Sequence, residues 1–247
     1  MKKLVFALLL VSTAAFSQEQ KEKPSFKSSV VVKWNPESLA FGKISLGSEI
    51  HLWHKRGITF NVGLPAKQTK TFSIDNKDRD VNIKSTSVMG GYRMYLGKSD
   101  ITGFYFEPYV KYVKSESSVA GVDYTIGTPS RTAIFTISND YKGFGVGAQL
   151  GLQFMIAKRI AFDMFLIGPE ANSSKEEMKA VETSNSLPWN MIETNDAKAK
   201  VQEFANDIPL IGKKLEITVD QANKTVRGNY SGFMPGFRAG VSVGIRF

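Results

Sequence analysis

The chain contains no cysteine and only two histidines, His51 and His54, among its 247 residues. Without cysteine it can form no disulfide, carry no lipid on an N-terminal cysteine and build no thiolate zinc site. Two histidines leave little for a histidine-based metal site. We therefore expect no metal and no other cofactor.

Long apolar runs are also lacking, except at the N-terminus. There Lys2 and Lys3 precede an apolar run over residues 4–11, and Ala15-Phe16-Ser17 supplies small residues before a cleavage site. The run is shorter than the roughly 20 residues that a membrane-spanning helix needs. We predict an export signal peptide over residues 1–17, cleaved before Gln18, and a periplasmic tail over residues 18–27.

The C-terminal segment alternates between two faces from residue 233 to residue 247. A period of two is that of a β-strand, and this one is long enough to cross a membrane. A terminal aromatic residue after alternating apolar positions is similar to the assembly signal of outer-membrane barrels. It implies the barrel-assembly machinery as a partner, with the signal on Phe237, Val241, Val243, Ile245 and Phe247.

Shorter alternating patterns recur upstream, over residues 44–52, 58–64, 88–96, 104–113, 144–156 and 160–166. The connections alternate in length. Residues 54–57, 97–102 and 157–159 are short, whereas 65–80, 115–140 and 169–227 are long. Short periplasmic turns and long extracellular loops are typical of outer-membrane barrels. With a first strand near residues 28–34, the sequence predicts an all-β, transmembrane, antiparallel up-and-down barrel of eight strands over residues 28–247.

The long connections contain patterns of their own. Residues 119–126 and 132–137 alternate around a turn at 127–130, which predicts a hairpin above the membrane. In the extracellular insertion 169–227, Ser174 and Glu177 fit a helix-capping box. A second short helix is expected over 196–206, and residues 215–219 should pair with 225–226. The last loop is therefore predicted to be long and partly helical.

The side chains expected to face the lumen are polar and of both charges. An eight-stranded barrel is just wide enough for its side chains to fill the interior. We expect a network of paired charges that closes the barrel, and a small ion path or binding pocket is the alternative. The predicted network consists of Glu49, Arg93, Glu107, Lys111, Asp163, Arg238 and Arg246, with Asn61, Gln149 and Gln153 beside it.

Two further interpretations concern aromatic and histidine residues. Trp34, Trp53, Tyr92 and Tyr95 suit anchors at the membrane interface, and ordinary packing is the alternative. His51 and His54 invite a comparison with lipid-modifying barrel enzymes, but both lie next to a short, periplasmic turn. A base there would be separated from the outer leaflet by the roughly 25 Å apolar band. We therefore predict no catalytic residues and no enzyme activity.

The net charge of +9 does not indicate a nucleic-acid partner, because the basic residues are scattered over turns and loops. They recur at the three short turns, as Lys55, Arg56, Lys98, Lys158 and Arg159. There they would lie near lipid phosphates. Outer-membrane lipids are therefore expected partners, and the identity of an extracellular ligand stays open.

The segments 31–36 (VVKWNP) and 41–49 (FGKISLGSE) resemble the start of small outer-membrane β-barrel proteins common in Bacteroidota, which share the barrel of outer membrane proteins A, X and W. The resemblance implies an outer-membrane location and an eight-stranded fold. We expect a structural role, or binding and adhesion through the loops. A narrow channel or carrier for a small solute is the alternative, and an outer-leaflet lipid-modifying enzyme is a third, less favoured one.

Overall fold

The computed structural model describes residues 28–74, 77–206 and 214–247, so the predicted signal peptide and N-terminal tail lie outside the described residues. Almost all regular structure is β-strand. The elements in chain order are β1 Ser29–Asn35, the 3-10 helix η1 Pro36–Phe41, β2 Lys43–Trp53, β3 Arg56–Pro65, β4 Gln68–Ile74, β5 Lys77–Tyr95, β6 Gly103–Ile126, β7 Arg131–Ile156, β8 Ile160–Glu182, the helix α2 Met191–Asn206, β9 Glu216–Asp220 and β10 Thr225–Arg246.

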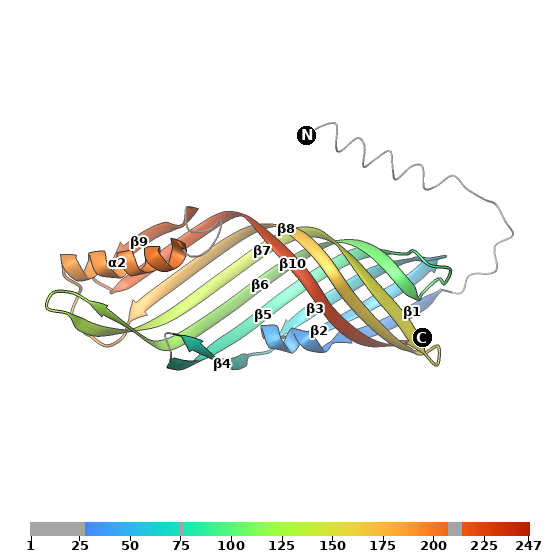
Figure 1. Cartoon of the computed structure of the whole chain (residues 1–247), viewed down its shortest axis with the longest axis horizontal. Coiled ribbons are helices and arrows are strands. Elements are labelled where there is room, and N and C mark those ends of the chain that lie inside the picture. Colours follow the sequence, from blue (N-terminus) through green and yellow to red (C-terminus); the bar gives the residue numbers. More distant parts are fainter. Residues whose placement is uncertain (1–27, 75–76, 207–213) are drawn as a thin grey trace, which may run out of the picture.

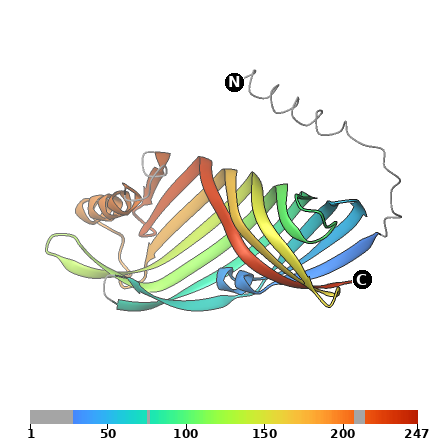
Figure 2. The same cartoon turned by 45° about the vertical axis from the view of Figure 1, so that its right-hand side comes forward.

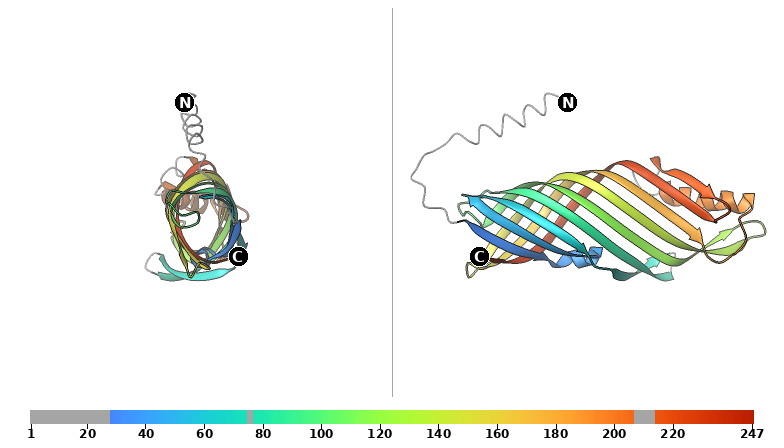
Figure 3. Two further views of the ribbon diagram at one scale, coloured as in Figure 1. Left: turned by 90° about the vertical axis from the view of Figure 1, so that its right-hand side faces the viewer. Right: turned by 180° about the vertical axis from the view of Figure 1, so that it is seen from behind.

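Eight antiparallel strands close into a ring, which we call the barrel (Figure 1). Neighbours follow the chain order β1-β2-β3-β5-β6-β7-β8-β10, and β10 pairs back with β1. The end-on view in Figure 3 shows the strands arranged as a ring. The predicted all-β, antiparallel ring of eight strands is confirmed.

Alternation in the sequence decides which side chains face the lumen. In β1, Val31 and Lys33 are buried, whereas Val30, Val32 and Trp34 are exposed. The same alternation runs through the other strands of the ring, in the parts nearest the short turns. Exposed apolar side chains therefore form a continuous band around the barrel. The predicted assembly-signal residues Phe237, Val241, Ile245 and Phe247 belong to this band, being 66%, 44%, 56% and 75% exposed.

The strands differ greatly in length, so the barrel is much taller on one side. β1, β2 and β3 have 7, 11 and 10 residues, but β6, β7, β8 and β10 have 24, 26, 23 and 22. The long strands continue well past the ends of β1, β2 and β3, as Figure 2 shows on the side of α2. We call this part the extension. It comprises residues 68–74, 77–84, 114–142, 170–182 and 216–232, with α2 against them.

Three of the loop predictions are confirmed within the extension. The hairpin around residues 127–130 is the continuation of β6 and β7, whose register runs to Ile126 opposite Arg131. Thr225 and Val226 pair with Asp220 and Val219. The helix expected over residues 196–206 is α2, which begins earlier, at Met191. β4, which pairs with β5, was not predicted.

The capping-box prediction at residues 174–177 is wrong, because this segment is the middle of the outer half of β8. Ser174 pairs with Gly143 on one side and Gly232 on the other. Its buried hydroxyl lies 3.0 Å from the Tyr141 hydroxyl rather than at a helix start. Backbone pairing with two neighbouring strands outweighs a local capping preference. The predicted loop 169–227 is correspondingly shorter, since β8 extends to Glu182 and β10 begins at Thr225.

Neither helix in the described ranges has the length and apolar character needed to cross a membrane.

Candidate functional site

Four of the predicted lumen residues meet inside the barrel, in the part nearer the short turns. They are Glu49 on β2, Arg93 on β5, Glu107 on β6 and Asp163 on β8, each at most 4% exposed. Arg93 Nε donates to Glu107 Oε2 at 2.7 Å, and Arg93 Nη1 donates to Asp163 Oδ2 at 2.7 Å and to Glu49 Oε2 at 3.0 Å. One guanidinium therefore joins carboxylates from three strands across the lumen.

Lys33 on β1 is a second cation of this network, and the prediction omitted it. Its Nζ donates to Glu49 Oε2 at 2.5 Å and to Asp163 Oδ2 at 2.7 Å. The alternation of β1 could have revealed it, because Lys33 shares the inward face of Val31. We call Lys33, Glu49, Arg93, Glu107 and Asp163 the lumen cluster.

Neutral side chains satisfy the remaining carboxylate oxygens of the lumen cluster. Tyr95 donates to Glu49 Oε1 at 2.5 Å, Tyr105 to Asp163 Oδ1 at 2.7 Å, and Thr59 to Glu107 Oε1 at 2.5 Å. The prediction of Tyr95 as a membrane anchor is wrong, because it lies on the inward face with Arg93 and is only 4% exposed. The Arg93 guanidinium also stacks on the Tyr105 ring, 3.7 Å from its centroid.

The lumen cluster fills the cross-section of the barrel at its level. Gln149 donates to Glu107, and the Gln153 oxygen accepts from both cations. The space left beside these groups is about 30 Å³. That volume holds roughly two water molecules. An arrangement of this kind fixes the register of five strands and obstructs passage through the lumen.

The other predicted lumen residues do not join this cluster. Lys111 forms an ion pair with Glu170, which also accepts from Tyr109 at 2.9 Å. Arg238 donates to Gln149 at 3.1 Å and stacks 4.3 Å from the centroid of the Phe165 ring. Within the described chain, Arg246 forms no ion pair. Among the described residues these three cations therefore form no ion pair with the lumen cluster, and Arg238 reaches it only through Gln149, which donates to Glu107.

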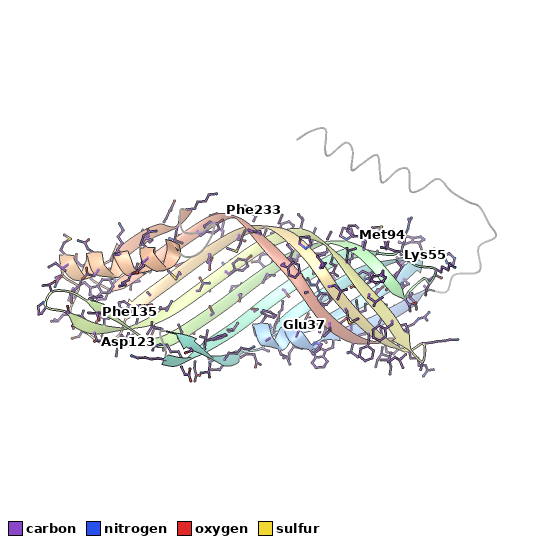
Figure 4. All side chains as sticks on the ribbon, viewed as in Figure 1. Glu37, Lys55, Met94, Asp123, Phe135 and Phe233 are labelled. Carbon is purple, nitrogen blue, oxygen red and sulfur yellow. The ribbon has the colours of Figure 1, made fainter. Side chains whose placement is uncertain are left out.

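Both histidines lie at the end of the barrel that carries the short turns. His51 is fully buried, with Nε2 3.0 Å from Glu49 Oε1 at an angle unsuited to a hydrogen bond. His54 Nδ1 lies 3.1 Å from Asp100 Oδ2. Figure 4 labels Lys55 at this end and Asp123 and Phe135 at the opposite one. Neither histidine is therefore near the extension.

A second site lies in the extension, beneath α2. The concave face of the sheet there is apolar, and Ile126, Phe135, Ala180 and Val226 form a buried core with Trp189 and Ala197. Beside this core is a cavity of about 180 Å³. Its described lining is apolar except for Lys200 and consists of Val119, Val122, Tyr124, Ile126, Phe135, Ile137, Met178, Ala180, Ala197, Lys200, Val201 and Val226.

Polar contacts hold α2 over this cavity. Arg131 donates to Glu182 at 2.5 Å and to Glu193 at 2.6 Å, and the Trp189 indole also donates to Glu182. We call Arg131, Glu182, Trp189 and Glu193 the helix anchor. Asn190 and Glu193 cap the helix reciprocally, each backbone amide donating to the other side chain at 2.9 Å.

The helix anchor perturbs the acidity of Glu182, which lies outside the apolar band. Burial raises the pKa of its carboxyl, but hydrogen bonds from Arg131, Trp189 and Ser184 outweigh burial and bring that pKa down to about 2. Glu182 is therefore a carboxylate throughout the neutral and mildly acidic range.

Comparison with known proteins does not assign the chain to a family. No family model matches the chain, and no curated protein matches it. Among solved structures, the chain is similar to the crystal structure of CarO from Acinetobacter baumannii. The identity is 11% and the TM-score 0.40, over 93% of this chain and 100% of that one. A likeness this remote does not assign the chain to a family.

Proposed function

We propose that the chain is an integral outer-membrane protein of the small Bacteroidota barrel type, anchored by a closed barrel and binding a small apolar molecule in its extension. The outer-membrane location is supported by the band of exposed apolar side chains around the ring. At the end that carries the short turns, β10 pairs with β1 and leaves no free strand edge. Pairing around the ring satisfies most of the backbone internally, as a lipid environment demands, and η1 lies against the part of β10 that has no strand partner. The basic short turns then face the periplasm.

The closed state of the barrel rests on the lumen cluster. Five charged side chains and their neutral partners occupy the lumen at this level, and the space beside them is about 30 Å³. A solute path would require these mutually paired charges to separate inside the barrel, which is costly. Conductance of the purified protein in planar bilayers tests this. We expect no steady channels, and channels that change when Glu107 or Arg93 is neutralised would support the narrow-channel alternative instead.

The observation that carries the binding role is the cavity of about 180 Å³ beneath α2. Protein interiors are normally close-packed, and apolar cavities of about 150 Å³ bind single-ring hydrocarbons. The volume and apolar lining suit a molecule of roughly six to ten non-hydrogen atoms. Because the cavity belongs to the extension, its ligand would be taken from the extracellular side.

A pair of alanines on α2 gives a matched test. Ala197 is 3% exposed and lines the cavity, whereas Ala199 is exposed on the same helix. Ala197→Leu should fill the cavity and abolish toluene binding, measured by calorimetry in detergent, while Ala199→Leu should bind toluene as the unmodified protein does. Equal toluene binding by both variants, or none by the unmodified protein, would refute the binding role.

We also propose that the chain is not an enzyme. Support comes from the position of the histidines at the end with short turns, and from the burial of His51 beside the lumen cluster. A nucleophile at the outer rim would have neither imidazole within hydrogen-bond reach.

A further inference from the structure

One edge of β10 is left without a strand partner in the described chain over residues 230–242. Its other edge pairs with β8 throughout this stretch. On the open edge, β9 reaches only Asn229 and β1 begins only at Val243. Figure 1 shows η1 lying against β10 here. The Glu37 side chain of η1 reaches β10, since a Cβ added to Gly240 would meet Glu37 Oε1 at 2.8 Å.

The position of η1 is fixed by Gly42, which ends it. Gly42 adopts φ +68°, and a Cβ there would lie 2.4 Å from the Ile83 carbonyl oxygen, so only glycine fits. The Gly42 carbonyl accepts from the amides of Ala66 and Ser85, both at 2.9 Å. These bonds tie the end of η1 to β5 and to the residue that follows β3. The open edge is therefore covered by a short helix rather than by a strand.

Behind η1 lies a cavity of about 220 Å³. Its lining includes Phe41 and Phe237, which are 62% and 66% exposed on the outer surface, and also Lys43 and Arg238 on the lumen side. A cavity bounded by both pairs connects the lumen with the surface between η1 and β10.

The cavity carries an excess of positive charge. Lys43, Lys111 and Arg238 are set against Glu37 and Glu170, which leaves a formal charge of +1. Lys111 is paired with Glu170. Among the described residues Lys43 Nζ donates only to Ser87 Oγ, at 3.0 Å, and it lies in the fields of Arg238, Lys111, Glu37 and Glu170. Among the described residues, neither Lys43 nor Arg238 forms an ion pair with a carboxylate.

The excess of +1 already includes the charge of Glu37. Glu37 faces Arg238 electrostatically, but its Oε2 is buried without a hydrogen-bond partner. Two cations from different elements, with hydroxyl groups of Ser38 and Ser87 beside them, remain directed into one space. Like charges in a partly desolvated site are unfavourable unless an anion joins them.

The depth of this site follows from strand geometry. Arg238 lies nine residues before Phe247, which ends the band at the side of the short turns. At about 3.3 Å per residue and a tilt near 40°, this separation is roughly 23 Å along the barrel axis. The apolar band of outer-membrane barrels is roughly 25 Å tall. If the proposed membrane location holds, Arg238 therefore lies at the headgroup level of the outer leaflet.

We infer that the cavity between η1 and β10 binds a phosphate group, held by Lys43 and Arg238. A guanidinium and an ammonium together match the several acceptor oxygens of a phosphate and its charge. The phosphate can belong to a lipid headgroup that enters from the side or to a free anion. Phe41 and Phe237 flank the entrance and provide apolar contact for acyl chains in the first case.

The free anion is tested with inorganic phosphate titrated calorimetrically into the full-length protein in non-ionic detergent. One saturable site is expected. Lys43→Gln and Arg238→Gln should each weaken it roughly 10-fold to 100-fold, because each removes a charged hydrogen-bond donor. Lys142→Gln, which removes an exposed lysine of the extension, should leave binding unchanged. This arm is independent of the proposed membrane location.

The lipid source is tested by reconstitution with equal amounts of phosphatidylglycerol and phosphatidylcholine, followed by native mass spectrometry. Preferential retention of phosphatidylglycerol that is lost in both variants identifies a headgroup site, and phosphate binding without lipid preference identifies a free-anion site. Either supports the inference, and the absence of both refutes it. Should the cation variants fail to fold, Glu37→Gln removes the competing carboxylate and should tighten binding several-fold, whereas unchanged or weaker binding would refute the site.

Discussion

Arg93 is the residue on which the lumen cluster depends most, and its replacement gives the sharpest test of the barrel interior. Its guanidinium contacts Glu49, Glu107 and Asp163, all at most 2% exposed. The cluster holds two positive and three negative formal charges. Arg93→Met keeps much of the apolar volume of the side chain but removes its charge. Lys33 is then the one cation of the lumen cluster, against three buried carboxylates. Removing one partner of a buried ion pair costs about 3–5 kcal/mol, and we expect that loss in the free energy of unfolding.

A double variant separates charge imbalance from lost packing. Arg93→Met with Glu107→Gln restores the original excess of one negative charge. The glutamine oxygen can still accept from Thr59, which donates to Glu107 Oε1 at 2.5 Å. The double variant should therefore be less destabilised than the sum of the single variants, by about 1–3 kcal/mol.

Urea unfolding in phospholipid vesicles, followed by tryptophan fluorescence, measures these differences. Arg159→Met, at an exposed short turn, is the control and should change the free energy of unfolding by less than about 0.5 kcal/mol. An Arg93→Met loss as small as that of the control would show that the cluster is not the paired network described above. Additive effects in the double variant would show that charge balance does not matter.

Three further outcomes are expected. Deletion of Phe247, whose backbone amide donates to the Val30 carbonyl at 2.8 Å, should reduce the fraction of protein that shows heat-dependent gel migration, and an unchanged fraction would contradict its role in assembly. The pKa of Glu182 is about 2 against an ordinary 4.5, so its stabilisation of α2 is complete above pH 4.5 and is lost as the pH falls towards 2. Trp189 fluorescence in a Trp34→Phe, Trp53→Phe protein should change in that window, and a transition above about pH 5 would rule out this assignment. Lipid A and phospholipid mass profiles should be the same in cells with and without the protein, and a modification that requires His51 or His54 would refute the absence of enzyme activity.

The ring of eight strands could be predicted because alternation is a repeated, local signal. Every strand of the barrel exposes apolar side chains on one face, and the alternating short and long connections fix the count. The position of Glu49, Arg93, Glu107 and Asp163 on the inward face followed from the same period. Alternation does not show how far along the barrel axis each inward-facing residue lies. Lys111 and Arg238 face inward as predicted, yet both line the cavity behind η1, which Arg93 does not reach.

The predictions that the structure contradicts also have specific physical causes. At residues 174–177 the local capping-box pattern predicts a helix start, although the segment continues β8 and pairs on both sides. The residue type of Tyr95 favours the membrane interface, whereas its place in the alternation of β5 puts it beside Arg93. The cavity beneath α2 has no local signal, because its lining comes from β6, β7, β8, β10 and α2. Only the fold brings these elements together.

The closure of the ring also determines the order in which the barrel can form. β6 and β7 share a register of more than twenty pairs around one tight turn, whereas β1 and β10 meet in four pairs, from Val31 with Arg246 to Trp34 with Val243. Contacts between the two ends of a chain carry the largest loop-closure entropy and are made late in folding. Lys33 lies in this last pairing, so its ammonium reaches Asp163 on β8 only once the ring has closed, whereas Glu49 lies on the neighbouring β2. Folding kinetics of a Lys33→Met protein should therefore show normal hairpin formation and a rapid reopening of the closed state.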